Sequence, residues 1–203
     1  MVAIDVFDDI LDEQSHRALW DFLVAPGWKY GAYSDNAAGA PRYYYKHFAG
    51  YSSSGTEARD PAGIAEELRA NFPPLYRMWR GIEQGILPGQ WLSRCYANAM
   101  PPGVSGGIHR DSFEPAHLTL IYYPQLTWTP EEGGETLFFD ESETRVVGRL
   151  EPRPNRLAVF PGVIPHRAEP IAADSPANRI TLMFKTLGRH TASQAGSVHA
   201  IVE

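Results

Sequence analysis

The sequence predicts a mainly β domain with flanking helices (α+β), in which a jelly-roll core follows a helical N-terminal half. After residue 90, eight short runs rich in β-branched and aromatic residues alternate with turn signals, at the spacing of a sandwich or barrel. Before residue 90, apolar residues recur at helical spacing in three segments. A plain α+β domain is the alternative, because counting strands does not show how they pair.

The helical half is defined by its caps and prolines. Asp12 is a suitable N-cap for a helix that extends to about Val24. Asp60-Pro61 starts a second expected helix over 60–72, and Pro73-Pro74 starts a third over 73–86. Each of the two has one apolar stripe. Between the first two helices, the aromatic segment 43–48 is typical of a strand.

Glycine and proline turns divide the β half into short strands. Pro-Pro-Gly at 101–103, Gly-Gly at 133–134 and Pro-Gly at 161–162 each fall between two runs. The eight expected strands are residues 91–99, 108–111, 117–123, 135–140, 144–150, 156–160, 166–171 and 179–186.

Composition limits the class of protein. The chain has 203 residues, 43% of them hydrophobic, which fits one domain with a real core and argues against disorder. Its 18 Lys and Arg against 24 Asp and Glu show no basic footprint, so no nucleic-acid partner is expected. The single cysteine, Cys95, indicates a reducing compartment and excludes cysteine-rich metal sites. Without a membrane-length apolar run or a signal peptide, we expect a cytoplasmic protein with no membrane partner.

Three residues form a candidate metal site. His109 and Asp111 lie two apart in an expected strand, so both side chains leave one face and can bind one ion, while Arg110 points away. With His166 they would complete the two-histidine, one-carboxylate triad of non-haem Fe(II) oxygenases. A His-x-Asp pair also occurs by chance, so hydrogen-bonded structural roles for these residues are the alternative.

Arg179 and Thr181 share one face of the last expected strand, in which the other residues up to Phe184 are apolar. A buried guanidinium needs an anion, and its forked donors suit a carboxylate to which Thr181 adds a hydroxyl. The far carboxylate of 2-oxoglutarate would fit such a pair. Glu135 or Glu169 of the protein itself is the alternative partner.

Taken in order, these motifs resemble the Fe(II)/2-oxoglutarate-dependent dioxygenases, and among them the prolyl-4-hydroxylase-like branch. The similarity is dense over residues 91–187 and thin over 25–90. The segments that carry it are His109-x-Asp111, Gly-Gly-Glu-Thr at 133–136, residues 156–162, His166, Arg179-x-Thr181 and the N-terminal residues 5–13.

The resemblance implies a double-stranded β-helix in which His109, Asp111 and His166 hold Fe(II). It implies that 2-oxoglutarate binds the metal through its C1 carboxylate and C2 ketone, with its C5 carboxylate on Arg179 and Thr181. O₂ would be the second co-substrate.

The resemblance also places Tyr96 beside the co-substrate and divides one domain into three parts. Residues 1–90 would supply helical support and a substrate lid, residues 91–187 the catalytic core, and residues 188–203 a polar tail. Because related halogenases lack the carboxylate that Asp111 supplies here, we expect hydroxylation of an unactivated C–H bond, or a related desaturation or cyclisation, with release of succinate and CO₂.

The substrate is left open by the sequence. A compact acidic domain suggests a small metabolite, such as an amino acid or a natural-product intermediate. A protein or peptide side chain is the second candidate, and a non-oxidative cupin-like metal module is a different class. Oligomeric state is not indicated. The candidate substrate contacts, each with ordinary packing as the alternative, are Tyr43, Tyr45, His47, His117 and Trp128.

Overall fold

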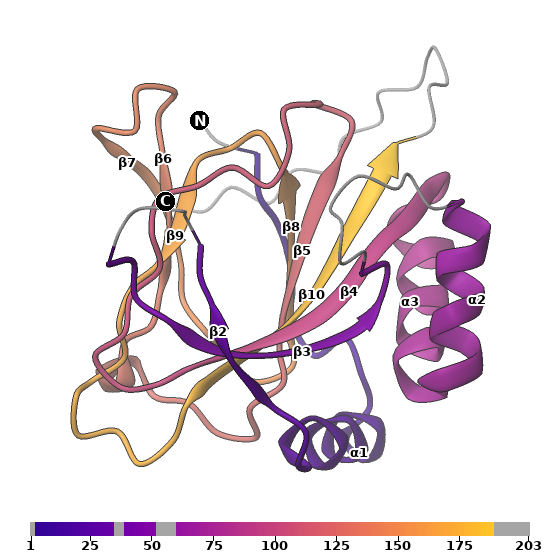
Figure 1. Cartoon of the computed structure of the whole chain (residues 1–203), viewed down its shortest axis with the longest axis horizontal. Helices are drawn as coiled ribbons and strands as arrows, with labels where there is room; N and C mark the ends of the chain where they lie inside the picture. The colour runs from indigo at the N-terminus through magenta and orange to yellow at the C-terminus, as the bar shows by residue number, and fades with distance from the viewer. Residues whose placement is uncertain (1–2, 35–38, 52–59, 189–203) are drawn as a thin grey trace.

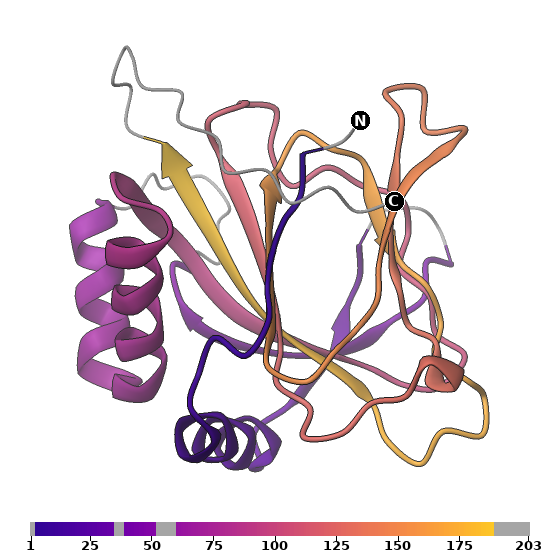
Figure 2. The same cartoon turned by 180° about the vertical axis from the view of Figure 1, so that it is seen from behind.

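The computed structural model describes residues 3–34, 39–51 and 60–188, and these form a two-sheet jelly roll with three helices (Figures 1 and 2). The major sheet has seven strands in the order β1-β8-β5-β10-β4-β3-β2, and the minor sheet has three in the order β7-β6-β9. All strand pairings among the described residues are antiparallel. The mainly β prediction is therefore confirmed.

The helices and strands have the following bounds. The helices are α1 (Glu13–Val24), α2 (Pro61–Asn71) and α3 (Pro73–Gly85). The strands are β1 (Asp5–Phe7), β2 (Lys29–Ala32), β3 (Tyr43–Ala49), β4 (Gln90–Met100), β5 (Leu118–Tyr123), β6 (Thr136–Phe139), β7 (Val146–Leu150), β8 (Arg156–Pro161), β9 (His166–Ala168) and β10 (Arg179–Gly188).

The helices cover the outer face of the major sheet, with α2 and α3 side by side at one flank and α1 apart from them (Figure 1). Asp12 caps α1 by accepting a hydrogen bond from the Ser15 amide at 2.9 Å, as its position predicted. The apolar stripes meet the sheet in one cluster, where the Trp79 and Phe184 rings stack at 5.9 Å. None of the described helices is both long and apolar enough to cross a membrane.

The N-terminal half is not simply helical, which corrects part of the expected architecture. β1 pairs with β8, while β2 and β3 extend the other end of the same sheet. β1 has three residues and β2 has four with Gly31 at φ 123°, so neither is long enough to produce an alternating pattern. Of the polar tail expected at 188–203, Gly188 is the last residue of β10, and residues 189–203 lie outside the described residues.

Two expected strands are shorter in the structure. Residues 108–111 form only an isolated bridge, between His109 and His166. The strand expected over 166–171 ends at Ala168, and Ile171 makes a separate bridge to Gly133. His109 and Asp111 therefore lie on irregular backbone, whereas His166 is the first residue of β9.

Candidate active site

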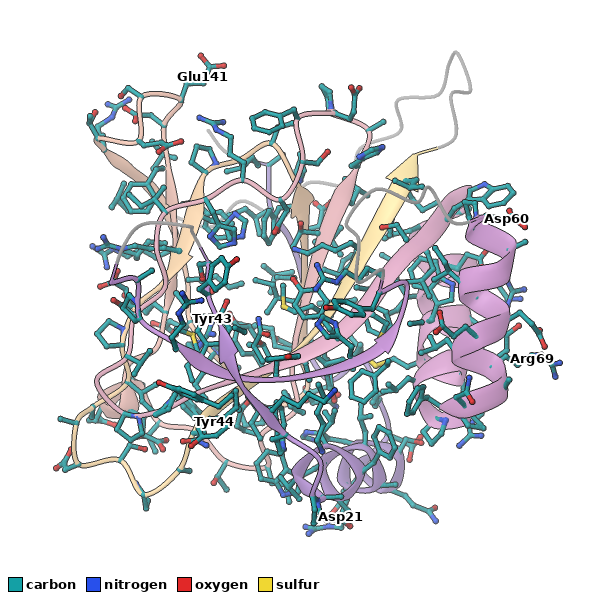
Figure 3. The ribbon with its side chains drawn as sticks, viewed as in Figure 1. Asp21, Tyr43, Tyr44, Asp60, Arg69 and Glu141 are labelled. Carbon is teal, nitrogen blue, oxygen red and sulfur yellow. The ribbon has the colours of Figure 1, made fainter. Side chains whose placement is uncertain are left out.

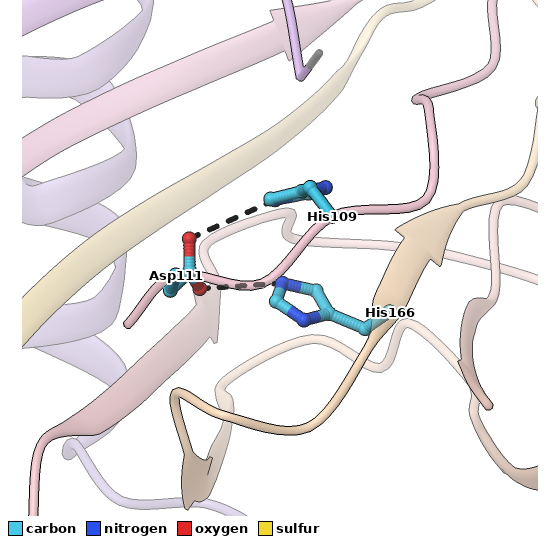
Figure 4. Close-up of side chains that lie close together, drawn as sticks. All are labelled: His109, Asp111 and His166. Atoms are coloured by element: carbon cyan, nitrogen blue, oxygen red, sulfur yellow. Dashed lines mark ion pairs between the residues drawn. The ribbon is translucent and has the colours of Figure 1, made fainter. Parts of the chain in front are cut away.

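His109, Asp111 and His166 come together in the space between the sheets (Figure 4). One ligand atom from each lies within 4.8 Å of the other two. His109 Nε2 is 3.7 Å from Asp111 Oδ1, and His166 Nε2 is 3.2 Å from Asp111 Oδ2. Reciprocal backbone hydrogen bonds of 3.0 Å between His109 and His166 fix the two histidines relative to each other.

Both histidines present the same nitrogen to the cluster. Nδ1 of His109 lies 2.9 Å from the Gly107 carbonyl, and Nδ1 of His166 lies 2.9 Å from the Ile164 carbonyl. A carbonyl can only accept, so Nδ1 carries the proton and the Nε2 lone pair is free for a metal. Burial, followed by the neighbouring His166, lowers the pKa of His109 and favours this neutral form.

The carboxylate of Asp111 is held ionised by a lysine. Burial alone would raise its pKa, but the ammonium of Lys185 outweighs burial and holds the pKa well below its usual range. Lys185 donates to Asp111 Oδ2 and, at 3.0 Å, to Thr119 Oγ1, which itself donates to Asp111 at 2.7 Å. Two imidazole nitrogens and one ionised carboxylate are a donor set that fits Fe(II).

Arg179 occupies another part of the same cavity and is 3% exposed. It donates to Thr136 Oγ1 at 2.9 Å and to the Tyr123 hydroxyl at 3.3 Å, while its buried Nε has no hydrogen-bond partner. The acidic alternatives are engaged elsewhere, since Glu135 pairs with Arg149 at 2.9 Å and Glu169 with Arg167 at 2.6 Å. Within the described part of the chain, this buried cation has no acidic partner.

The cavity that joins these groups has a volume of about 310 Å³. Thr181 lies beside Arg179 on the inward face of β10, and Tyr96 lines the cavity from the neighbouring strand β4. Burial and then the charge of Asp111 raise the pKa of Tyr96, so its hydroxyl stays protonated and can donate. The co-substrate candidates of the sequence thus line one cavity with the metal cluster.

Two of the five substrate candidates line this cavity. Tyr43 and His47 do so from β3, where Tyr43 and Tyr44 leave the strand on opposite sides (Figure 3). Tyr45 lies next to the opening, its ring 5.0 Å from that of His47, and lines an adjoining surface groove.

The structure does not bring His117 and Trp128 to the cavity. His117 precedes β5 by one residue, outside its alternation, and its Nδ1 lies 2.8 Å from the hydroxyl of Ser112. Trp128 donates from its indole nitrogen to the Gly133 carbonyl at 3.1 Å and lines a different groove. Both positions depend on loop geometry, which strand periodicity does not describe.

Sequence reasoning missed two cations near the metal cluster, Lys185 and Arg94. Lys185 lies on the same strand face as Arg179 and Thr181, so alternation along β10 was a usable signal. Arg94 shares the inward face of β4 with Tyr96, but its neighbour across the opening comes from β3, far away in the sequence. Cys95, on the opposite face of β4, is fully buried in the apolar cluster.

Comparisons with known proteins agree with this geometry. The model of the 2OG-Fe(II) oxygenase superfamily matches residues 95–184. An oxidoreductase of the 2OG-Fe(II) oxygenase family from Burkholderia pseudomallei is similar in structure, with a TM-score of 0.63 at 13% identity over 94% of this chain and 87% of that one. A Pseudomonas putida prolyl-4-hydroxylase is also similar in structure, with a TM-score of 0.58 at 19% identity over 93% of this chain and 94% of that one.

A third solved structure, HygX from Streptomyces hygroscopicus with nickel and 2-oxoglutarate bound, gives a TM-score of 0.59 at 10% identity over 93% and 84% of the two chains. At these identities the structures show a shared fold. No curated protein sequence matches this chain as a relative.

Proposed function

Because residues 95–184 match the model of the 2OG-Fe(II) oxygenase superfamily, we propose that the chain is a member of this superfamily and hydroxylates an unactivated C–H bond of a small metabolite, such as an amino acid or a natural-product intermediate. It is an enzyme, with Fe(II) as cofactor and 2-oxoglutarate and O₂ as co-substrates. The observation that carries the proposal is one cavity holding both a His-Asp-His cluster and a buried arginine without an acidic partner among the described residues.

His109, Asp111 and His166 would hold Fe(II), which when bound supplies the oxidative chemistry. The protein keeps the two Nε2 lone pairs free and the carboxylate ionised. Asp111 also bears on the reaction type, since the carboxylate occupies the position that related halogenases leave to halide. Its presence supports transfer of oxygen to the substrate, with succinate and CO₂ as the co-products.

Arg179 and Thr181 would bind the C5 carboxylate of 2-oxoglutarate. Thr136 and the Tyr123 hydroxyl already fix one side of the guanidinium, so the buried Nε and the remaining donors are available to the co-substrate. A fixed anion site at a set distance from the metal cluster orients the diacid, and Tyr96 adds a protonated hydroxyl beside it.

The size of the cavity supports a small substrate. About 310 Å³ is at the lower limit of ligand pockets, and this space must hold the co-substrate as well as the reacting part of the substrate. A peptide side chain reaching in from outside is the other substrate class to be tested, since one similar structure is described as a prolyl-4-hydroxylase.

Anaerobic addition of Fe(II) and 2-oxoglutarate to the purified protein tests the proposal. We expect a weak visible charge-transfer band in the wild type and none in His109→Ala. Succinate release in air, measured with amino-acid, metabolite and peptide pools, then separates the substrate classes. Stimulation by peptides alone would replace the small-metabolite proposal, and 2-oxoglutarate-independent behaviour with no band would indicate a non-oxidative metal module.

A further inference from the structure

We infer, on the basis of the proposed function, that Arg94 binds the substrate itself and selects small molecules that carry a carboxylate. Arg94 is on the inward face of β4 and lines the same cavity as His109, Asp111 and His166. It is a second cation without an acidic partner among the described residues, separate from the arginine assigned to 2-oxoglutarate.

The contacts of Arg94 fix its guanidinium but do not neutralise it. The guanidinium lies over the Tyr96 ring at 4.5 Å, and Nη2 is 3.4 Å from Nδ1 of His47. Its Nε is buried and has no hydrogen-bond partner. Burial, then the charges of Arg94 and Lys29, lower the pKa of His47 to about 4, so the imidazole is neutral and accepts a hydrogen bond without adding a counter-charge.

The cavity offers Arg94 no anion of its own. Among its described lining residues Asp111 is the single acid, and that carboxylate is already paired with Lys185. Arg110, the other arginine of the lining besides Arg179, lies 3.4 Å from Glu143 and donates to two backbone carbonyls. A partly buried, unpaired guanidinium is costly unless a ligand supplies the charge.

The register of the sheet separates Arg94 from the co-substrate site. Arg94 pairs across the ladder with Lys185, which contacts the metal ligand Asp111, whereas Arg179 pairs with Met100. Arg94 and Met100 are six positions apart on β4, which corresponds to about 20 Å of strand. The two guanidinium groups are therefore anchored at opposite ends of the strand pair, with Arg94 at the end that reaches the metal cluster.

The single unpaired guanidinium group of Arg94 favours a carboxylate as its ligand. Its planar donors can bind both oxygens of one carboxylate, whereas a phosphate dianion calls for further cations that the described lining does not leave free. The cavity also contains the Tyr43 hydroxyl, 3.2 Å from Ser34 Oγ, as a neutral polar group for the rest of the molecule. The substrate class is thus a small monocarboxylate such as a free or N-acylated amino acid.

Equilibrium binding to the protein loaded anaerobically with Fe(II) and 2-oxoglutarate tests this inference without turnover. The probes are the twenty standard L-amino acids and their N-acetyl derivatives, each paired with its carboxamide, and the readouts are calorimetry and the charge-transfer band. We expect at least one acid to bind and its amide to bind far more weakly. In Arg94→Gln the affinity for that acid should fall on the order of 100-fold and the acid should lose its advantage over the amide.

Arg94→Lys, which keeps the charge but not the fork, should give an intermediate loss. Arg145→Gln removes a distant arginine whose side chain is 78% exposed and should bind like the wild type. The inference is overturned if no acid in the panel binds, if an amide binds as tightly as its acid, or if Arg94→Gln keeps wild-type affinity. A charge-transfer band that persists in these cases leaves the proposed function standing, whereas its absence in the wild type refutes both.

Discussion

The two faces of β10 are both withdrawn from solvent, yet their chemistry is opposite. Ile180, Leu182 and Phe184 face outward, with Leu182 and Phe184 in the apolar cluster beneath the helices. The inward face carries Arg179 and Lys185, of which Arg179 is 3% exposed. Burial therefore does not separate core from site in this molecule. The two faces differ instead in whether their polar groups have hydrogen-bond partners. The outer face is apolar and needs none, whereas the inner face has a buried guanidinium nitrogen of Arg179 that is left for a ligand.

The largest effect of a substitution is expected at the metal cluster, which lies on the inward side of the sheet. His166→Ala removes one of three ligands, and Fe(II) affinity should fall more than 100-fold, because removal of groups that merely orient ligands already costs about 10–100-fold. Two measurements check this loss of affinity: the metal content of the protein after dialysis, and the rate of succinate release. His117→Ala is the matched control, because His117 lies outside the cavity. Retention of Fe(II) by the His166 variant would contradict the assigned site.

On the outer face, the expected loss is one of stability. Phe184→Ala opens a cavity against Trp79, so the free energy of unfolding should fall by about 3–5 kcal/mol in urea titrations. The Fe(II)- and 2-oxoglutarate-dependent band of the remaining folded protein should be unchanged. Phe113→Ala, at an 86% exposed position, should alter stability by about 0.5 kcal/mol or less. Equal losses in the two variants would mean that Phe184 is not a core residue.

Arg179→Met should have the opposite result to Phe184→Ala, with a loss of co-substrate binding and no loss of stability. The KM for 2-oxoglutarate should rise about 100-fold, because a buried charge pair with the co-substrate is lost. The free energy of unfolding of the ligand-free protein should stay the same or increase, since an unpaired buried charge is replaced by an apolar side chain of similar length. Arg149→Met, at a surface ion pair with a side chain 59% exposed, is the control for both measurements. A destabilised variant with normal KM would make Arg179 structural.

Alternation along β10 explains how much of the site was visible in the sequence. It placed Arg179 and Thr181 on one face, and the same rule extends to Lys185. What it could not supply is the partner across the fold, because the contact of Lys185 with Asp111 joins residues 74 apart in the chain. The ordered motifs after residue 90 predicted the jelly roll, whereas β1 and β2 are edge strands too short to carry a pattern.

The opening of the cavity gives the smallest expected effect, a pH dependence that belongs to His47. Its pKa in the folded protein is about 4, lowered first by burial and then by Arg94 and Lys29, whereas an unfolded chain protonates this group near 6.5. Between these values the unfolded state binds more protons, so the contribution of His47 to stability is lost as the pH falls from about 6.5 to 4.

His47→Gln removes this titration, so its free energy of unfolding should decrease less than that of the wild type between pH 7.5 and pH 5.0 in urea titrations. The sign of this difference follows because Gln stays neutral in both the folded and the unfolded state. Tyr45→Phe changes the neighbouring ring, 5.0 Å away, and leaves His47 in place, so it should keep the wild-type dependence. Parallel pH dependences for His47→Gln and the wild type would mean that His47 is not held neutral, and Arg94 would then face a second cation instead of a neutral acceptor.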